Sequence, residues 1–266
     1  AKIGRTQRPD VACAKLCEGR VVLIVNGAPA ALTLPFLFAE NFQAADDYYL
    51  PHPYANVGRM LRLIGFVLAF WVPGIYIALI LHHPQMLPGK MLLSITAARE
   101  NVPLSSLFEM LILFAVFEML RETGSRMPEA VGLALNIVGA IVLGQSAVDA
   151  GFFSAPMVIV VAFSGTMGLM VRQLRGTVFF LRAGFILAGA WLGLFGVAAL
   201  SGALWCYLHS LSTQNIPYLY TFSPLYVHAA QDAFWRGKIP FMNFRQRCMS
   251  DNGTRQGVTP EREDDR

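Results

Sequence analysis

Long uncharged stretches recur between residues 61 and 209, and this pattern predicts a membrane domain. Four windows carry no charged side chain: 63–81, 130–148, 150–171 and 183–208. A helix of 19 residues is about 28 Å long, which matches a hydrocarbon core of about 30 Å. The last window is longer than a bilayer requires, so we expect it to tilt or to end in the interface. Pro73-Gly74, inside the first window, predicts a kink.

A fifth segment, 104–121, is helical in pattern but carries Glu109 and Glu118. Nine residues at about 100° each place these two carboxylates on opposite faces of a helix. Such a helix lies in the interface, crosses inside a bundle, or lines a polar cavity. We therefore expect an all-α polytopic membrane protein with four or five membrane helices, of which this one is amphipathic or re-entrant.

The flanks predict a small α/β fragment before the membrane domain and a polar segment after it. Residues 9–17 are expected to form a helix. The apolar run 21–25, Asn26-Gly27 and residues 30–34 predict a β-hairpin with a type I′ turn. We interpret 1–60 as the remnant of a cytoplasmic N-terminal domain and 61–209 as the membrane domain. Residues 210–250 are expected to be an interfacial and basic cytoplasmic segment, and 251–266 a disordered tail.

Composition supports a membrane protein. Only 14% of the residues are charged, against about 25% in soluble domains, and 14 of the charged residues are spread over the 148 positions 61–208. This excludes a soluble two-domain enzyme and a disordered chain. The net charge of +4 suits contact with anionic lipid headgroups and is too small to indicate nucleic-acid binding.

No sequence motif indicates catalysis, a cofactor or a metal site. The phosphate-binding, nucleophile-elbow, zinc-protease and dinucleotide-binding motifs do not occur. Cys13 and Cys17 share a helix face, but no histidine lies near them in sequence to complete a metal site. We therefore expect neither an enzyme nor a metalloprotein.

Polar side chains inside the apolar region are the candidate functional residues. Burying a charge or an amide in hydrocarbon is costly, so such groups normally face the protein interior or water. One interpretation is a lining for an ion path, in which oxygen atoms meet cations and each group is repeated around the axis of an oligomer. The other is hydrogen bonding between helices and anchoring at the interface. The candidates are Glu109, Glu118, Gln145, Asp149 and Asn136.

Two of these candidates differ in their neighbours along the helix. Glu118 has Arg121 within one turn, whereas Glu109 has no cationic residue at that spacing. Because the two face opposite ways, at most one lines a given pore directly. We therefore favour Glu109 for the ion path.

Small residues four apart predict close helix contacts. Gly189 and Gly193 form a GxxxG pair, and Ala140 with Gly144 gives the looser form of the same pattern. Small side chains at this spacing let helix backbones approach each other, within a subunit or between subunits.

Several stretches together resemble the A subunits of bacterial spore germinant receptors, the GerA family, which includes the related stage V sporulation protein AF. Among them are Arg8-Pro-Asp-Val, the run 16–29 that ends in Asn-Gly-Ala-Pro, and Pro217-Tyr-Leu. The others are 42–49, 92–103, 117–128 and 137–151. Their order and spacing are similar across roughly residues 8–225. Where the family usually has a further glutamate, this chain has Phe114, and 171–176 is basic where the family is uncharged.

The resemblance implies an inner-membrane protein of endospore-forming bacteria, with a larger soluble N-terminal domain of which 1–60 is a remnant. It also implies a transporter-like B subunit and a lipoprotein C subunit as partners, besides membrane lipid. Family members help to convert nutrient sensing into ion release, and the A subunits are thought to oligomerise into an ion channel.

The function expected from residues and resemblance together is a non-enzymatic subunit that couples a signal to ion movement. We expect the N-terminal fragment and the basic tail on the cytoplasmic side. Two alternatives remain. A stand-alone secondary transporter needs internal repeats, and none is evident between 61–145 and 146–208. A membrane scaffold without conduction needs no ion path.

Overall fold

The computed structural model describes residues 3–126, 128, 139, 144–214, 216–220 and 235–237. The chain divides into two compact units. Unit 1 comprises Ala1–Leu63 and Leu204–Arg266, and unit 2 comprises Ile64–Ala203. The elements follow in the order β1 (Gly4–Thr6), α1 (Pro9–Cys17), β2 (Val21–Leu23), β3 (Ala31–Leu34), η1 (Phe38–Phe42), η2 (Ala45–Tyr48), α2 (His52–His82), η3 (Pro84–Met86), α3 (Gly89–Arg99), α4 (Ser106–Arg126), α6 (Gly144–Asp149), α7 (Ala155–Leu169), η5 (Arg172–Leu174), α8 (Arg175–Ser210), β4 (Ser212–Thr213) and β5 (Ile216–Pro217).

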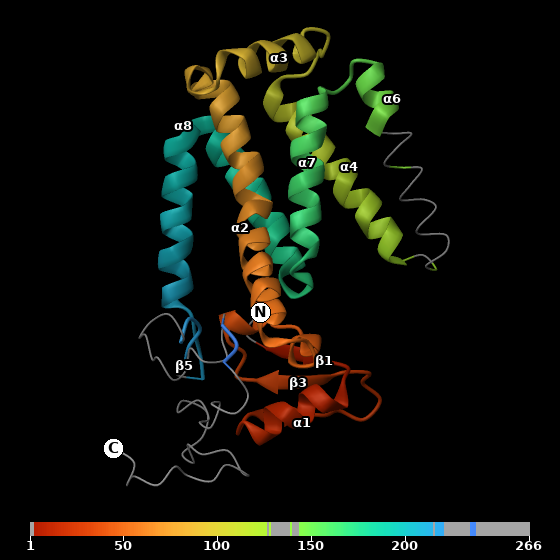
Figure 1. Ribbon diagram of the computed structural model, residues 1–266, viewed down its shortest axis with the longest axis vertical. Coiled ribbons are helices and arrows are strands. Elements are labelled where there is room, and N and C mark those ends of the chain that lie inside the picture. The colour runs from red at the N-terminus through yellow and green to blue at the C-terminus, as the bar shows by residue number, and fades with distance from the viewer. Residues whose placement is uncertain are drawn as a thin grey trace. The chain divides into compact units, whose positions relative to one another are not determined.

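Unit 1 contains a three-stranded antiparallel sheet in the order β1-β3-β2, with α1 packed against it (Figure 1). Helix α1 has the predicted bounds, with Pro9 in its first turn, where a missing N–H costs nothing. The predicted hairpin is confirmed, because β2 pairs with β3 and places Val22 opposite Thr33. Strand β1, which pairs with the other edge of β3, has no counterpart in our sequence-based prediction.

The turn of this hairpin differs from the predicted type I′ geometry. Gly27 has a positive φ of 83°, but Asn26 is not among the residues with positive φ. The N–H of Ala28 donates to the carbonyl of Val25 over 3.1 Å. A positive φ at the third turn residue alone is the geometry of a type II turn. Strand β2 ends at Leu23, just before this turn, and β3 begins only at Ala31.

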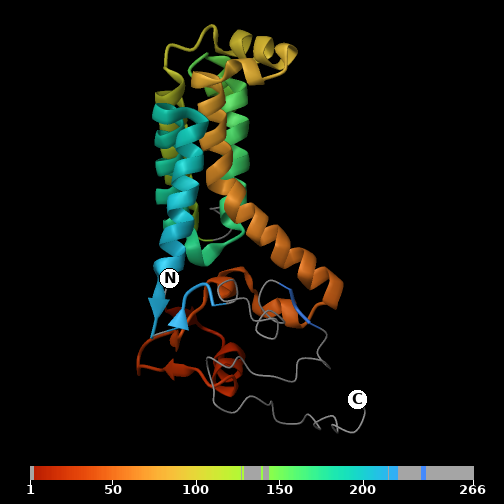
Figure 2. The same cartoon turned by 90° about the vertical axis from the view of Figure 1, so that its left-hand side faces the viewer.

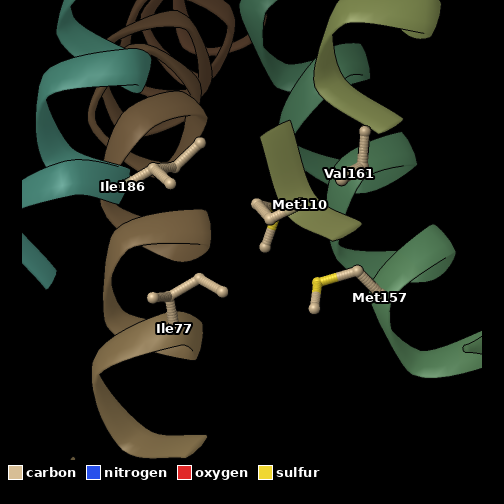
Figure 3. Close-up of a cluster of buried hydrophobic side chains, with 5 residues drawn as sticks. All are labelled: Ile77, Met110, Met157, Val161 and Ile186. Carbon is tan, nitrogen blue, oxygen red and sulfur yellow. The ribbon is translucent and has the colours of Figure 1, made fainter. Parts of the chain in front are cut away.

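Unit 2 is a helix bundle. Figures 1 and 2 show α2, α7 and α8 alongside one another, with α3 lying across one end. Five fully or nearly buried apolar side chains from four helices form its core (Figure 3): Ile77 of α2, Met110 of α4, Met157 and Val161 of α7, and Ile186 of α8. The helix predicted over 104–121 is found as α4, which begins two residues later, at Ser106, and continues to Arg126.

Helix α8 is not one continuous rod. Gly193 has non-helical dihedral angles (φ 62°, ψ −148°), and the chain reverses there. A Cβ built on Gly184 lies 3.7 Å from the Leu200 side chain, whereas sixteen residues of straight helix would separate them by about 24 Å. The uncharged window 183–208 is therefore two helical arms folded back on each other, rather than one tilted helix.

Two stretches of the described chain are long and apolar enough to cross a membrane, His52–His82 and Arg172–Ser210. The window 150–171 gives a shorter apolar helix, α7, of 15 residues. Most of the window 130–148 lies outside the described residues. Unit 2 also exposes large apolar side chains, among them Ile159, Phe180, Trp191 and Phe195 at 67–74%. Soluble domains rarely expose so many, so lipid is their natural surrounding.

Candidate functional site

Glu109 of α4 is a fully buried carboxylate. Its Oε1 accepts hydrogen bonds from both the backbone N–H and the hydroxyl of Ser154, each 2.6 Å long. Ser154 is the residue before α7, and its side chain makes no capping bond within its own helix. The first N–H groups of a helix lack intrahelical partners and attract negative charge. Glu109 therefore caps α7 from the neighbouring helix.

The second oxygen of Glu109 faces two further helices. Its Oε2 lies 3.6 Å from Nε of Arg99, in α3, and the two groups form an ion pair. Among the described residues, neither of these atoms nor the buried hydroxyl of Tyr76, in α2, has a hydrogen-bond partner. The Tyr76 hydroxyl lies within electrostatic range of both charges. The arrangement therefore retains the capacity to bind a bridging water or a proton next to the carboxylate.

Glu118 lies in a different environment. Its side chain is 22% exposed and pairs with Arg121 one turn further along α4. The structure thus separates the two glutamates, one into the bundle core and the other into a local ion pair.

The other ion-path candidates are placed less centrally or fall outside the described residues. Gln145 and Asp149 lie exposed on the short helix α6. Asn136 and Ala140 lie outside the described residues, and a Cβ built on Gly144 meets open space.

Gly189 and Gly193 of α8 have different structural roles. A Cβ built on Gly189 would lie 2.4 Å from the carbonyl oxygen of Gly74, in α2, closer than any real contact. At Gly193 the conformation itself favours glycine, because its φ is positive, and a Cβ would lie 3.1 Å from His82. Gly189 therefore permits a helix contact, whereas Gly193 permits the reversal of α8.

Arg182 of α8 is a functional candidate that our sequence reasoning missed. It directly precedes the uncharged window 183–208, which is the position of a charge that flanks a membrane span. In the structure it is 2% exposed. Its Nε donates to the carbonyl of Ala69 over 3.0 Å, and its Nη2 donates to the carbonyl of Ser164 over 2.8 Å. The guanidinium also lies 4.8 Å from the centre of the Phe114 ring.

A signal for Arg182 was present in the sequence, in the proline of α2. In lipid, a carbonyl freed by proline has to find another donor inside the protein. Pro73 predicts such a carbonyl at Ala69, although it does not say which helix supplies the donor.

Unit 1 contains its own buried carboxylates. Glu40 is 6% exposed and pairs with Arg20 and with Lys15, the latter over 2.9 Å. Burial alone raises the pKa of Glu40, but the charges of Lys15 and Arg20 outweigh burial, and its pKa lies below the ordinary value. Asp47 is buried in the same way and pairs with Arg59 and Arg62.

These contacts join elements of unit 1 to one another, so we interpret them as structural. The part of the chain that the structure describes holds no group of three or more histidine, cysteine, aspartate or glutamate residues able to bind a metal ion. Cys13, Cys17 and Cys206 are exposed free thiols.

Comparison with known proteins gives consistent matches. Residues 1–248 match the family described as Bacillus/Clostridium GerA spore germination protein. The chain is 37% identical over 240 residues to spore germination protein KA of Bacillus subtilis (strain 168), an alignment that covers 87% of this chain and 43% of that protein. It is 34% identical over 258 residues to spore germination protein GerQA of Bacillus cereus, covering 96% and 52%.

A third relative is the uncharacterized membrane protein YfkQ of Bacillus subtilis (strain 168), which is 34% identical over 265 residues, covering 96% of this chain and 50% of that protein. The chain thus spans about half the length of the curated relatives it matches. No solved structure matches it.

Proposed function

The chain belongs to the GerA family of spore germination proteins, and from this we propose that it is the membrane part of a germinant-receptor A subunit. In this role it sits in the inner membrane of a spore-forming bacterium. It acts with a transporter-like B subunit and a lipoprotein C subunit, and several copies assemble around one axis. Its activity is to couple a nutrient signal to the release of ions.

The observation that carries this proposal is the combination of an apolar exterior with charged groups buried inside unit 2. Side chains such as Phe180 and Trp191 are more than 70% exposed, whereas Glu109 and Arg182 are at most 2% exposed. Ionisable groups inside a membrane bundle are costly, and they mark functional contacts more often than exposed charges do.

We place the ion path near Glu109, with Gln145, Asp149, Asn136 and Glu118 as further candidates. Glu109 is fully covered in a single chain and bound to Ser154. A path along Glu109 therefore requires a second conformation, in which α4 and α7 separate enough for water to reach the carboxylate. A gate of this kind supports release only after a signal.

Cation flux through the purified full-length protein tests this function. The protein, co-purified with its partner subunits, is reconstituted into vesicles, and potassium efflux is followed with and without nutrient. Spores lacking the protein are assayed in parallel for nutrient-triggered potassium release. The matched variant is Glu109→Gln, which keeps the size of the side chain and removes its charge.

We expect nutrient-dependent efflux that Glu109→Gln changes by tenfold or more. Slow release from the deleted spores without any efflux from vesicles would favour a scaffold over a channel. Normal release from the deleted spores, for every nutrient that the parent spores respond to, would contradict the proposed function.

A further inference from the structure

Pro73 leaves one backbone acceptor of α2 without its helical donor. In an α-helix the N–H of residue 73 bonds the carbonyl of residue 69, but proline has no N–H. Pro73 lies inside α2, so the carbonyl of Ala69 is the group set free. An unpaired carbonyl in a membrane interior is costly, so another donor has to bind it.

Two side chains from different helices take up this carbonyl. The hydroxyl of Ser164, in α7, donates to the Ala69 oxygen over 2.7 Å, and Nε of Arg182, in α8, donates over 3.0 Å. Arg182 also donates from Nη2 to the backbone of Ser164 over 2.8 Å. The Ala69 carbonyl thus joins α2 to both α7 and α8.

The surroundings fit the guanidinium closely. A Cβ built on Gly168 of α7 would lie 2.9 Å from Nη2 of Arg182, so the glycine leaves space for this group. The guanidinium carbon also lies over the Phe114 ring of α4, 4.8 Å from its centre. Among the described residues, Arg182 makes no ion pair with a carboxylate, and its polar contacts are to backbone carbonyls.

We infer that Arg182 is a positioning residue that replaces the backbone donor missing at Pro73, and so clamps α2 at its proline to α7 and α8. The clamp resists motion at the point where α2 lacks a helical bond. Its release requires the same carbonyl to lose both donors at once.

A double-mutant cycle between Pro73 and Arg182 tests this inference. Pro73→Ala restores the N–H that bonds the Ala69 carbonyl, so Arg182 is no longer needed there. The thermal unfolding midpoint of the purified full chain in lipid nanodiscs is measured for the parent, Pro73→Ala, Arg182→Gln and the double variant. Arg172→Gln makes the same charge change at an exposed position and serves as the control.

Arg182→Gln should change the unfolding midpoint differently in the two backgrounds. We expect the midpoint change with Pro73→Ala to be about 2–4 °C more positive than the change with Pro73 present. This difference corresponds to one hydrogen bond in a chain of this size. Arg172→Gln should give equal shifts in both backgrounds. Whether Arg182→Gln alone raises or lowers the midpoint is not the test, because removing a buried charge also removes its desolvation cost.

Equal shifts of Arg182→Gln in the two backgrounds would overturn the inference. If Arg182→Gln folds only with Pro73→Ala, the rescue supports it directly. If it folds in neither background, the cycle of Ser164→Ala with Pro73→Ala decides by the same criterion, since Ser164 donates to the same oxygen.

Release of the clamp also predicts a change in spores, and this step rests on the proposed function. Arg182→Lys keeps the charge but loses the fork that reaches two carbonyls. In spores with full-length protein at parent levels, it should raise potassium release without nutrient several-fold, and Pro73→Ala should reverse the rise. If Pro73 and Arg182 are coupled in nanodiscs but the variants do not change potassium release from spores, the regulatory role is overturned and the structural role of the clamp stands. Spores that release potassium normally without the protein would instead contradict the proposed function.

Discussion

Glu109 and Glu118 belong to one helix but differ in the contacts that each carboxylate makes. Glu109 accepts two hydrogen bonds from Ser154 and pairs with Arg99, on other elements, whereas Glu118 forms an ion pair with its own neighbour Arg121. Removing a buried carboxylate leaves its partners unsatisfied inside the protein, and this usually costs more than the pair itself is worth.

We predict that Glu109→Ala lowers the free energy of unfolding by about 3–5 kcal/mol, against about 1 kcal/mol or less for Glu118→Ala. For a chain of this size, the former corresponds to a drop of about 6 °C or more in the unfolding midpoint. Circular dichroism of the two purified variants in lipid checks the difference. In spores at equal protein level, Glu109→Ala should also alter potassium release more than Glu118→Ala. Equal losses of stability would contradict the assignment of Glu109 as the capping residue of α7.

Glu40 predicts how unit 1 responds to acid. Because its folded pKa lies below the ordinary value of 4.5, the folded state binds fewer protons than the unfolded state. The stability from Glu40 is therefore complete above pH 4.5 and is lost as pH falls through the lower folded pKa. We expect the unfolding midpoint of the chain to fall in this acidic range, and Glu40→Gln to reduce the dependence on pH there. A parent and a variant that respond equally to pH would exclude Glu40 as the cause.

Single residues also show where sequence reasoning ends. The separation of Glu109 from Glu118 follows from helical spacing alone, and so does the pairing of Glu118 with Arg121. The capping of α7 by Glu109 does not follow, because Ser154 is 45 residues away in sequence and only tertiary packing brings the two together. Arg182 was missed because its charge resembles that of a residue at the end of a span.

At the scale of elements, the contact between α2 and α8 depends on two glycines. Gly189 and Gly74 let the two backbones approach closely, next to the proline of α2. We predict that Gly189→Ala lowers the unfolding midpoint by several degrees, because a Cβ 2.4 Å from the Gly74 oxygen forces the helices apart. Gly202→Ala is the control: among the described residues, no atom beyond its own stretch of helix lies within 4 Å of a Cβ built there, so it should be neutral or stabilise α8 by about 0.5–1 kcal/mol. Equal effects of the two variants would show that the contact is not restrictive.

The elements themselves were predictable to different degrees. Local signals sufficed for α1, whose proline and apolar spacing fix its bounds, and for the pairing of β2 with β3. Strand β1 has only three residues, and its partner β3 begins 25 positions after it ends, so no local pattern reveals it. The reversal at Gly193 was also hidden, because hydropathy reports which residues prefer lipid and carries no information on the direction of the chain.

At the scale of the whole molecule, contacts within unit 1 join distant parts of the sequence. The Asn41 side chain donates to the Tyr218 hydroxyl over 3.1 Å, and the Asn56 side chain accepts from the N–H of Arg236 over 2.7 Å. Residues in direct contact lie on one side of a membrane. These contacts therefore support the expectation that the N-terminal fragment and the basic tail share a side.

Cysteine labelling checks this arrangement. In a variant with all four native cysteines replaced, single cysteines near Met60 and near Arg245 should react with a membrane-impermeant reagent from the same side. We expect equal labelling in inside-out vesicles and protection of both positions in right-side-out ones. Labelling from opposite sides would contradict a shared location.

The reversal of α8 at Gly193 has a consequence for how the protein enters the membrane. Its two arms are joined by an apolar corner in which Trp191, Leu192 and Phe195 are exposed, and no charged residue occurs between Arg182 and the end of the helix at Ser210. A corner with exposed apolar side chains and no charged residue is poorly suited to remain in water while the second arm is being synthesised. If the first arm were inserted alone, it would also lack the second arm, whose Leu200 side chain lies close to Gly184. We therefore expect the two arms to enter the membrane together, as a helical hairpin.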